Sequence, residues 1–356
     1  MINLKSEQIH SDAYQHKIIK CLVWDLDNTL WHGVLLEDKH VNLHDDVIHI
    51  IKTLDSRGIL QSIASKNDHK RAMDKLQEWG LQEYFLYPQI NWNSKAHSIQ
   101  KISQSINISL ENIAFIDDQD FELAEVRCYY PQVICFQASD LRQLLDIPEM
   151  NPSLITEDAK QRRMMYLSDI NRKQDEETFF GSQEEFLATL NMHLTISSAQ
   201  IEDLQRASEL TVRTHQLNTT GYTYSYEELN HFRQSDQHKL LIAELNDKYG
   251  NYGKIGLALI ECQPDKWTIQ LLLMSCRVMS RGVGTVILNY LIKLAQDHHV
   301  TLYAQFVANN QNRMMYITYK FAGFEEFKSC EKLTLLTHNF SQVQPFPEYM
   351  TIEIKN

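Results

Sequence analysis

Apolar residues follow two alternating patterns through about the first 150 residues of the chain. Short, almost wholly apolar runs predict buried strands at 19–25, 60–65, 112–118 and 132–137. Apolar residues at helical spacing predict helices at 45–59, 69–81 and 95–106, and in ELAEVRCYYP from Glu122. Strands that alternate with helices are typical of a parallel sheet with right-handed crossovers. We therefore expect an α/β domain whose site lies beyond the carboxyl ends of its strands.

The pattern changes after about residue 138, and a second α/β arrangement follows. The stretch 156–174 predicts a helix that links the two. Further strands are expected at 238–245, 255–262, 267–276 and 301–307, with a long helix at 283–298. We predict an N-terminal extension, a first domain, a helical linker, a second domain and a C-terminal tail, bounded as 1–18, 19–150, 151–185, 186–345 and 346–356.

The composition is that of a globular protein with enough material for two cores. Of its 356 residues, 43% are hydrophobic and 22% are charged. A formal net charge of −12 argues against nucleic acid as a partner, because non-specific binding to it needs a basic surface. No apolar stretch reaches the roughly 20 residues that span a bilayer. The polar start lacks the apolar run of a signal peptide, and the six cysteines show no C-x-x-C spacing. We expect a cytoplasmic protein with no membrane contact.

Two carboxylates follow the first predicted strand, in the sequence D-L-D-N-T that begins at Asp25. Residues two apart in an extended segment point the same way, so Asp25 and Asp27 can face one reacting centre. One can attack phosphorus or hold a metal while the other moves a proton. Asp117 and Asp118 end another predicted strand and are natural further ligands. Oxygen-only ligands suit Mg²⁺, which we expect as the cofactor.

Other polar residues at strand ends complete a candidate phosphate site. Ser65 ends the second predicted strand, and Lys66 and Asn67 follow it. A hydroxyl, amides and a lysine there can hold phosphate oxygens, and Lys95 can offset the charge of phosphate and nucleophile. The expected substrate-binding residues of this half are Asn28, Thr29, Ser65, Lys66 and Asn67.

Taken alone, D-L-D-N-T is also a common turn with helix-capping residues. The complete order of strand–DxDxT, strand–Ser, Lys and strand–Asp-Asp resembles the four motifs of the haloacid dehalogenase superfamily. That resemblance implies a phosphoryl-handling Rossmann-like domain. The predicted helices and strands largely fill the intervals between Asp25, Ser65 and Lys95, which leaves no room for a large cap domain. A capless site suits a macromolecular substrate, or a lid supplied by another domain.

The second half resembles the Gcn5-related N-acetyltransferase fold. The resemblance lies in 309–327, with Asn312, Tyr316, Tyr319, Gly323 and Phe324 in the expected order. That fold binds the pyrophosphate of coenzyme A at an R/Q-x-x-G-x-G/A loop. Here Met279 takes the first position, and Gly282 and Gly284 follow at a predicted helix N-terminus. Two interpretations stay open: a scaffold without coenzyme A chemistry, or a site for a phosphopantetheine arm.

Together and in this order, the two domains resemble the FkbH-like family over about 18–345. The matching stretches are KCLVWDLDNTLWHGVLLED, SKND, FIDDQDFELAEVR, RTHQLNTTGYTY, YGNYGKIGLALI and MSCRVMSRGVG. The resemblance implies a glyceryltransferase of polyketide assembly lines. Such an enzyme takes the glyceryl group of 1,3-bisphosphoglycerate, releases its phosphates and loads it as a thioester on an acyl carrier protein. The product typically becomes a methoxymalonyl or hydroxymalonyl extender unit.

Acyl transfer to a thiol suits a cysteine intermediate. Some relatives have a cysteine between the two motif acids, where this chain has Leu26. Cys276, which ends a predicted strand, is the first candidate for an acylated residue, and Cys21 is the second. A core position would also account for either cysteine, and direct transfer to the carrier thiol stays open. Arg213 and His215 are weaker candidates for substrate binding or acid–base chemistry.

An acidic carrier protein would need a basic face on this acidic chain. One short segment supplies Lys160, Arg162, Arg163, Arg172 and Lys173, although intervening acids also fit a solvated helix of mixed charge. Two competing functions remain. One is a Mg²⁺-dependent phosphatase acting on a phosphoprotein or phosphosugar. The other is a non-catalytic scaffold that binds carrier proteins, which the complete acid set disfavours.

Overall fold

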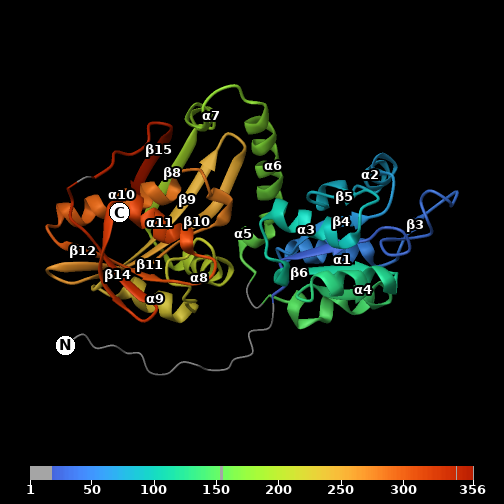
Figure 1. Ribbon diagram of the computed structural model, residues 1–356, viewed down its shortest axis with the longest axis horizontal. Coiled ribbons are helices and arrows are strands. Elements are labelled where there is room, and N and C mark those ends of the chain that lie inside the picture. The colour runs from blue at the N-terminus through green and yellow to red at the C-terminus, as the bar shows by residue number, and fades with distance from the viewer. Residues whose placement is uncertain (1–17, 153–154, 342, 356) are drawn as a thin grey trace. The chain divides into compact units, whose positions relative to one another are not determined.

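The computed structural model describes residues 18–152, 155–341 and 343–355. The chain divides into two compact α/β units, Met1–Arg163 and Met164–Asn356 (Figure 1). Within the described ranges, no helix is both long enough and apolar enough to cross a membrane.

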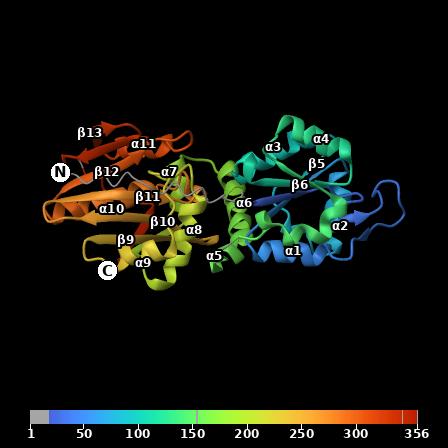
Figure 2. The same cartoon turned by 90° about the horizontal axis from the view of Figure 1, so that it is seen from below.

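The first unit is built on a five-stranded parallel sheet in the order β5-β4-β1-β6-β7. Its strands are β1 (Cys21–Trp24), β4 (Leu60–Ser65), β5 (Gln89–Ile90), β6 (Ile113–Asp117) and β7 (Ile134–Gln137). Its main helices are α1 (Val47–Ser56), α2 (His69–Glu78), α3 (Lys95–Ile106) and α4 (Asp120–Tyr129). Figure 2 shows α1 and α2 on one face of the sheet and α3 and α4 on the other. From β1 the chain adds strands on one side of the sheet, β4 and then β5, and from β6 it adds β7 on the other side. The boundary between these two halves lies between β1 and β6, where a site is expected in such folds.

The apolar runs form these strands because both faces of the sheet are covered. All four residues of β1 are completely buried, and the Trp24 indole donates a hydrogen bond to Gln61 Oε1 at 3.2 Å. A short hairpin of β2 (Trp31–His32) and β3 (Asn42–Leu43) follows β1. Single 3₁₀ segments occur at Gln82–Tyr84, Leu110–Asn112, Ala138–Asp146 and Pro148–Met150.

The second unit has an eight-stranded sheet in the order β13-β14-β12-β11-β10-β9-β8-β15. Its strands are β8 (Met192–Ser198), β9 (His238–Asp247), β10 (Gly250–Cys262), β11 (Lys266–Met274), β12 (Thr301–Val307), β13 (Phe324–Cys330), β14 (Leu333–His338) and β15 (Met350–Lys355). Its helices are α7 (Gln183–Thr189), α8 (Leu204–Arg213), α9 (Tyr226–Gln234), α10 (Val283–Asp297) and α11 (Arg313–Phe321). Neighbouring strands run antiparallel except in the pairs β11–β12 and β15–β8.

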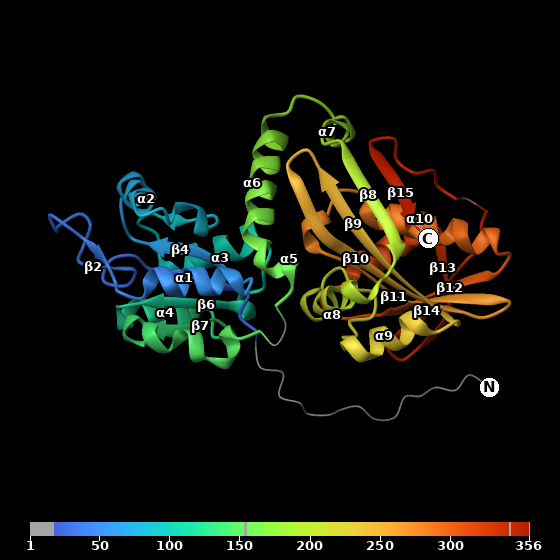
Figure 3. The same cartoon turned by 180° about the vertical axis from the view of Figure 1, so that it is seen from behind.

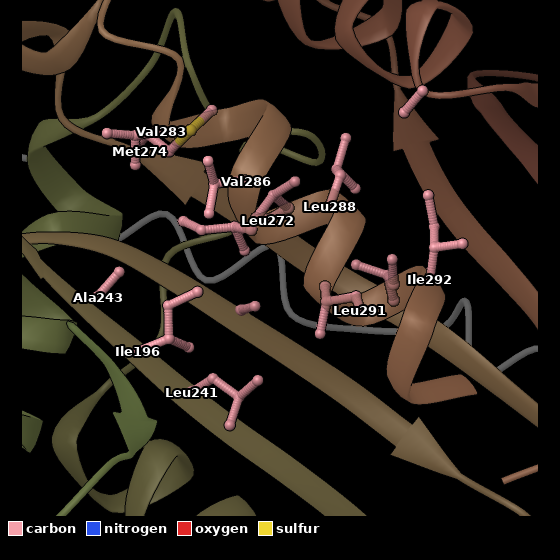
Figure 4. Packing of buried hydrophobic residues seen from close by; sticks show 14 of the residues in the cluster. Ile196, Leu241, Ala243, Leu272, Met274, Val283, Val286, Leu288, Leu291 and Ile292 are labelled. Carbon is pink, nitrogen blue, oxygen red and sulfur yellow. The ribbon is translucent and has the colours of Figure 1, made fainter. Parts of the chain in front are cut away.

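Successive side chains of β9 point to opposite faces of the sheet, and each face has its own hydrophobic core. Leu241 and Ala243 belong to the core beneath α10 and α11, whereas Leu240 and Ile242 belong to the core beneath α8 and α9. Figure 4 shows the first core, in which the apolar side of α10 packs on the sheet. Helices on both faces hold β11 in the middle of the sheet.

Two predicted boundaries differ from the structure. Residues 346–356 were expected to be a tail, but β15 lies within them and pairs in parallel with β8 (Figure 3). The segment 151–185 was expected to be one helical linker. Instead, α5 (Glu157–Lys160) and α6 (Arg162–Thr178) are separated at Gln161, and the division between the units falls inside α6.

The three arginines of the predicted basic segment make hydrogen bonds within their own units. Within the first unit, Arg162 donates to Gly58 O at 2.7 Å, and Arg163 Nε donates to Asp55 Oδ1 at 3.0 Å. In the second unit Arg172 is only 1% exposed and donates from Nε and Nη2 to the carboxylate of Asp247 at 2.5 and 3.0 Å. These guanidinium groups stabilise each unit from within, because a charged donor makes a strong hydrogen bond. Arg162 and Arg172 are buried and Arg163 is half-buried.

Candidate active site

The candidate site lies at the carboxyl ends of three adjacent strands of the first unit. Asp25 follows β1, Ser65 ends β4 and Asp117 ends β6, and β1 lies between the other two strands. Because all three strands run parallel, these ends meet at one edge of the sheet. The Asp25 amide donates to Ile116 O at 2.9 Å, which fixes the start of the acid loop against β6.

Three carboxylates form a compact group at this edge. Asp25, Asp117 and Asp118 each offer one oxygen, and these oxygens lie within 4.8 Å of one another. Asp25 and Asp117 are buried, and among the described residues Asp118 Oδ1 has no hydrogen-bond partner. Burial, followed by the charge of Asp25, raises the pKa of Asp117 to about 6 and also raises the pKa of Asp118. Three carboxylates this close repel one another, and a bound cation would offset that repulsion. Their oxygen atoms are the kind of ligand that Mg²⁺ prefers.

Lys95 compensates part of this charge. It is the first residue of α3, whose N-cap Ser94 accepts a hydrogen bond from the His97 amide. Its ammonium contacts the Asp25 carboxylate, donates to Ala64 O at 2.9 Å and lies 3.0 Å from Asp117 Oδ2. Burial lowers the pKa of Lys95, but the charges of Asp25 and Asp117 outweigh it, so this pKa lies above its usual value. Three ionised carboxylates and one ammonium leave two negative charges, which one divalent cation would balance.

The carboxylate of Asp27 lies outside this group, although the sequence predicted it as a metal ligand. Its Oδ1 accepts hydrogen bonds from Trp31 Nε1 at 2.8 Å and from the Leu35 amide at 3.1 Å. Its Oδ2 accepts from Asn67 Nδ2 at 2.9 Å. Burial nevertheless raises the pKa of Asp27. A carboxyl group that is held in place and takes up a proton readily suits the acid–base role better than the metal role.

The other predicted phosphate-binding residues of this unit fall into two groups. Asn28 and Thr29 form a turn: Asn28 has φ +53° and accepts from the Gly33 amide at 3.0 Å, and Thr29 is fully buried. The turn accounts for Asn28, whereas the buried Thr29 hydroxyl has no hydrogen-bond partner among the described residues. Ser65 is buried at the end of β4, and Asn67, buried in the loop that follows, donates to Asp27. Lys66 pairs with Glu122, a residue that the sequence analysis missed because an acid in the first turn of a helix looked ordinary.

The acid group makes stability and metal binding depend on pH in opposite ways. The pKa of Asp117 is about 6 in the folded protein, against 3.8 for an unperturbed aspartate, so protons favour folding. We expect the metal-free protein to lose stability as the pH rises from about 3.8 to about 6. Mg²⁺ needs ionised ligands, so its stabilising effect should be larger at pH 7.5 than at pH 5. Melting temperatures with and without Mg²⁺ test both trends.

Asp117→Asn is the matched variant for this test. It should melt higher than the parent in the metal-free state at pH 7.5, because one of three repelling charges is gone. It should also lose most of the shift caused by Mg²⁺. An equal Mg²⁺ shift in variant and parent would contradict a metal site at this group.

In the second unit, a short segment fills the gap between two separating strands. The parallel pairing of β11 with β12 stops at Ile269 and Ala304. Beyond that point Leu217–Thr219, which we call the strap, lies between them. Met274 N donates to Leu217 O at 2.9 Å, Thr219 N donates to Leu272 O at 3.0 Å, and Val307 N donates to Thr219 O at 2.9 Å.

Buried side chains fasten the strap. Asn312 Nδ2 donates to Asn218 O at 3.0 Å and to Val307 O at 2.9 Å, and Asn218 and Asn312 are fully buried. Separating strands offer unpaired backbone groups to which an extended, amide-bearing ligand can add. The strap uses those groups at Leu272, Met274 and Val307.

The remaining predicted site residues belong to the second unit, and two of them come just before the strap in sequence. Arg213 ends α8, with Nε 3.9 Å from Glu209 Oε1, and His215 is exposed. Cys276 is half-buried, and its Sγ donates to Gln216 Oε1 at 3.9 Å. These three residues belong to the second unit, whereas the acids belong to the first. Cys21, the other candidate thiol, is fully buried in β1, and burial raises its pKa far above the usual value.

The glycine loop before α10 is crowded by other residues of the second unit. Buried Arg281 donates from both Nη atoms to Glu176 Oε2 at 3.2 Å. Gly282 has φ +77°, and a Cβ at this position would clash with the Tyr349 hydroxyl. The strap and this loop lead us to expect that coenzyme A does not bind to the second unit.

Titration calorimetry with coenzyme A should therefore show no saturable heat. Hydrogen exchange at the amides of Thr219, Met274 and Val307 should be slow and unchanged by coenzyme A. Faster exchange at these three amides in its presence would show instead that the ligand displaces the strap.

No family model matches the chain, and no curated protein matches it. Among solved structures it is similar to the N-terminal part of a Bacteroides fragilis protein that contains a phosphatase domain, complexed with Mg. The identity is 28% and the TM-score 0.34, over 39% of this chain and 42% of that one, so less than half of that structure is matched. A ribosomal-protein alanine N-acetyltransferase from Escherichia coli matches with 19% identity and a TM-score of 0.34, over 42% of this chain and 96% of the other. PaiA N-acetyltransferase from Thermoplasma acidophilum, in complex with coenzyme A, matches with 16% identity and a TM-score of 0.34, over 41% and 99%.

Proposed function

We propose that the protein is a phosphoryl-handling transferase of the FkbH-like type. It would transfer the glyceryl group of 1,3-bisphosphoglycerate to the phosphopantetheine thiol of an acyl carrier protein. Two phosphates would be released, and the product would supply a methoxymalonyl- or hydroxymalonyl-type extender unit for polyketide biosynthesis. The observation that supports this most is the group of Asp25, Asp117 and Asp118 with Lys95 in contact. The long sequence stretches that resemble the FkbH-like family favour the glyceryl donor.

The chemistry of the phosphate monoester follows from the acid loop. Asp25 attacks phosphorus, the bond from phosphorus to the glyceryl oxygen breaks, and Asp27 gives its proton to that oxygen. Water then attacks the aspartyl phosphate while Asp27 takes up a proton, which releases phosphate and restores both acids. Asp25, Asp117 and Asp118 would hold Mg²⁺, which offsets the charge of the phosphoryl oxygens when bound. Lys95 contacts the Asp25 carboxylate and holds it in place for the attack.

The acyl phosphate needs a thiol and no redox partner. The carrier thiolate attacks the acyl carbon, the bond from that carbon to the phosphate oxygen breaks, and phosphate leaves with the electron pair. Over both steps, one donor, one carrier thiol and one water give one glyceryl thioester and two phosphates. Direct attack by the carrier is favoured over an intermediate at Cys21, because burial in β1 raises the pKa of that thiol.

Intact-mass spectrometry of a carrier protein in its phosphopantetheine form tests the proposal. The carrier is incubated with the protein, Mg²⁺ and 1,3-bisphosphoglycerate generated in situ, beside an Asp25→Asn control. A glyceryl mass on the carrier that is lost in the control supports the transferase. A glyceryl mass on the protein itself would locate an acylated residue, with Cys276 mapped first.

A phosphatase acting on a phosphoprotein or phosphosugar is the second candidate. The burial of Arg162 and Arg172 favours it, because two of the five cations in the predicted basic segment are turned inward, away from an acidic carrier. Phosphate release with several carriers left unmodified would establish this function in place of the transferase.

A further inference from the structure

An ion pair reaches across the candidate site from one neighbouring strand to the other. Lys66 directly follows β4, and Glu122 lies in the first turn of α4, just after β6. Lys66 Nζ and Glu122 Oε1 are 2.5 Å apart. β1 lies between β4 and β6, so those two strands are about 9.5 Å apart. The pair therefore crosses the carboxyl end of β1, where Asp25 begins the acid loop.

The two partners differ in solvent exposure. The Glu122 side chain is 6% exposed, and among the described residues its Oε2 has no hydrogen-bond partner. The Lys66 side chain is 36% exposed. An ammonium carries three donors, so Lys66 can bind a second acceptor from the solvent side while Glu122 holds it. A buried carboxylate is the fixed member of such a pair, because it has little room to follow the lysine.

Lys95 has a different role. Its ammonium is buried and contacts Asp25, Asp117 and the Ala64 carbonyl, so the protein itself takes up its bonds. An anion that arrives from solvent therefore meets Lys66 before Lys95. Of the two lysines at this edge, Lys66 is the one placed to hold a ligand.

We propose that Lys66 binds the non-bridging oxygens of the substrate phosphoryl group and that Glu122 is a positioning residue that holds Lys66 over Asp25. The inference rests on the proposed phosphoryl chemistry of this unit. Without Glu122, the Lys66 side chain is free to adopt several rotamers. Substrate binding then has to fix one of them, which costs entropy and lowers the affinity. The loss then falls mainly on substrate binding, since neither residue takes part in bond making.

Steady-state hydrolysis of p-nitrophenyl phosphate with Mg²⁺ tests the proposal through a double-mutant cycle. Glu122→Gln and Lys66→Met should each raise KM by about tenfold, the worth of one hydrogen bond to a charged group. We expect kcat to change by less than about threefold. Adding Glu122→Gln to Lys66→Met should cause no further rise, because Glu122 acts through Lys66. Lys66→Arg should restore part of the affinity.

The matched control is Asp74→Asn, which breaks the exposed Lys70–Asp74 pair on α2 and should leave KM unchanged. Additive effects in the double variant, or an unchanged KM for Lys66→Met, would overturn the proposal. Urea unfolding of each variant separates lost binding from lost stability. If the parent protein does not hydrolyse the ester, the proposed function is decided separately by the glyceryl mass on the carrier protein. Calorimetric binding of inorganic phosphate then still decides whether Lys66→Met weakens anion binding.

Discussion

Lys95→Met is expected to reduce the free energy of unfolding by about 3–5 kcal/mol in the metal-free protein at pH 7.5. The substitution keeps the apolar stem but removes the ammonium that contacts Asp25 and Asp117. Both carboxylates are buried, so each would keep its desolvation cost without its partner. Urea denaturation followed by circular dichroism measures the change.

Three comparisons make this expectation specific. Lys101→Met, at an exposed position of the same helix, should change stability by less than about 0.5 kcal/mol. The loss in free energy of unfolding caused by Lys95→Met should be smaller at pH 5, because Asp117, with its pKa of about 6, then takes up a proton. Mg²⁺ should restore part of the stability at pH 7.5. A loss below about 1 kcal/mol would mean that the three acids are neutralised in another way.

Asp25→Asn is expected to lower the rate of phosphate release by about 10⁴-fold or more, because an amide is a far weaker nucleophile than a carboxylate. The variant should still fold, since Lys95 keeps Asp117 as a partner and one repelling charge is gone. Phosphate release from an acyl phosphate or p-nitrophenyl phosphate measures the rate, and a melting curve reports the fold.

The neighbouring acid gives a graded comparison. Asp27→Asn should lower the rate by about 10²–10⁴-fold, the range of general acid–base catalysis. Asp45→Asn, at an exposed position before α1, should leave the rate unchanged. If Asp25→Asn kept more than about one hundredth of the activity, Asp25 would not be the nucleophile.

The sequence predicted β1, β4 and β6 and the acids at their ends because a parallel strand buried on both faces leaves a nearly continuous apolar run. Parallel order then places the ends of these strands at one edge of the sheet. The different role of the Asp27 carboxylate was not predictable in this way. It depends on Trp31 and Leu35, whose positions are set by a hairpin too short to show a pattern.

The strap and the buried arginines show a second limit. Leu217–Thr219 lies in a polar stretch typical of a loop, yet Asn218 and Thr219 are fully buried by hydrogen bonds to two strands. Arg172 sits in a helix of mixed charge, and only the fold brings Asp247 to it. The sequence shows that a side chain is polar, but it does not show whether that side chain is buried. A polar side chain can be buried when a distant segment supplies its hydrogen-bond partner, and that depends on the tertiary structure.

The pairing of β15 with β8 has a consequence for how the second unit is made. Thr195 of β8 and Glu353 of β15 are hydrogen-bonded although they are 158 residues apart in sequence. At roughly 5–20 residues per second, a ribosome needs about 10–30 s to cover that interval. During this time the outer edge of β8 stays unpaired, and an open strand edge is a template for pairing with other chains. The nascent chain is therefore most vulnerable to aggregation after β8 emerges, and slowing elongation between β8 and β15 should lower the yield of soluble protein.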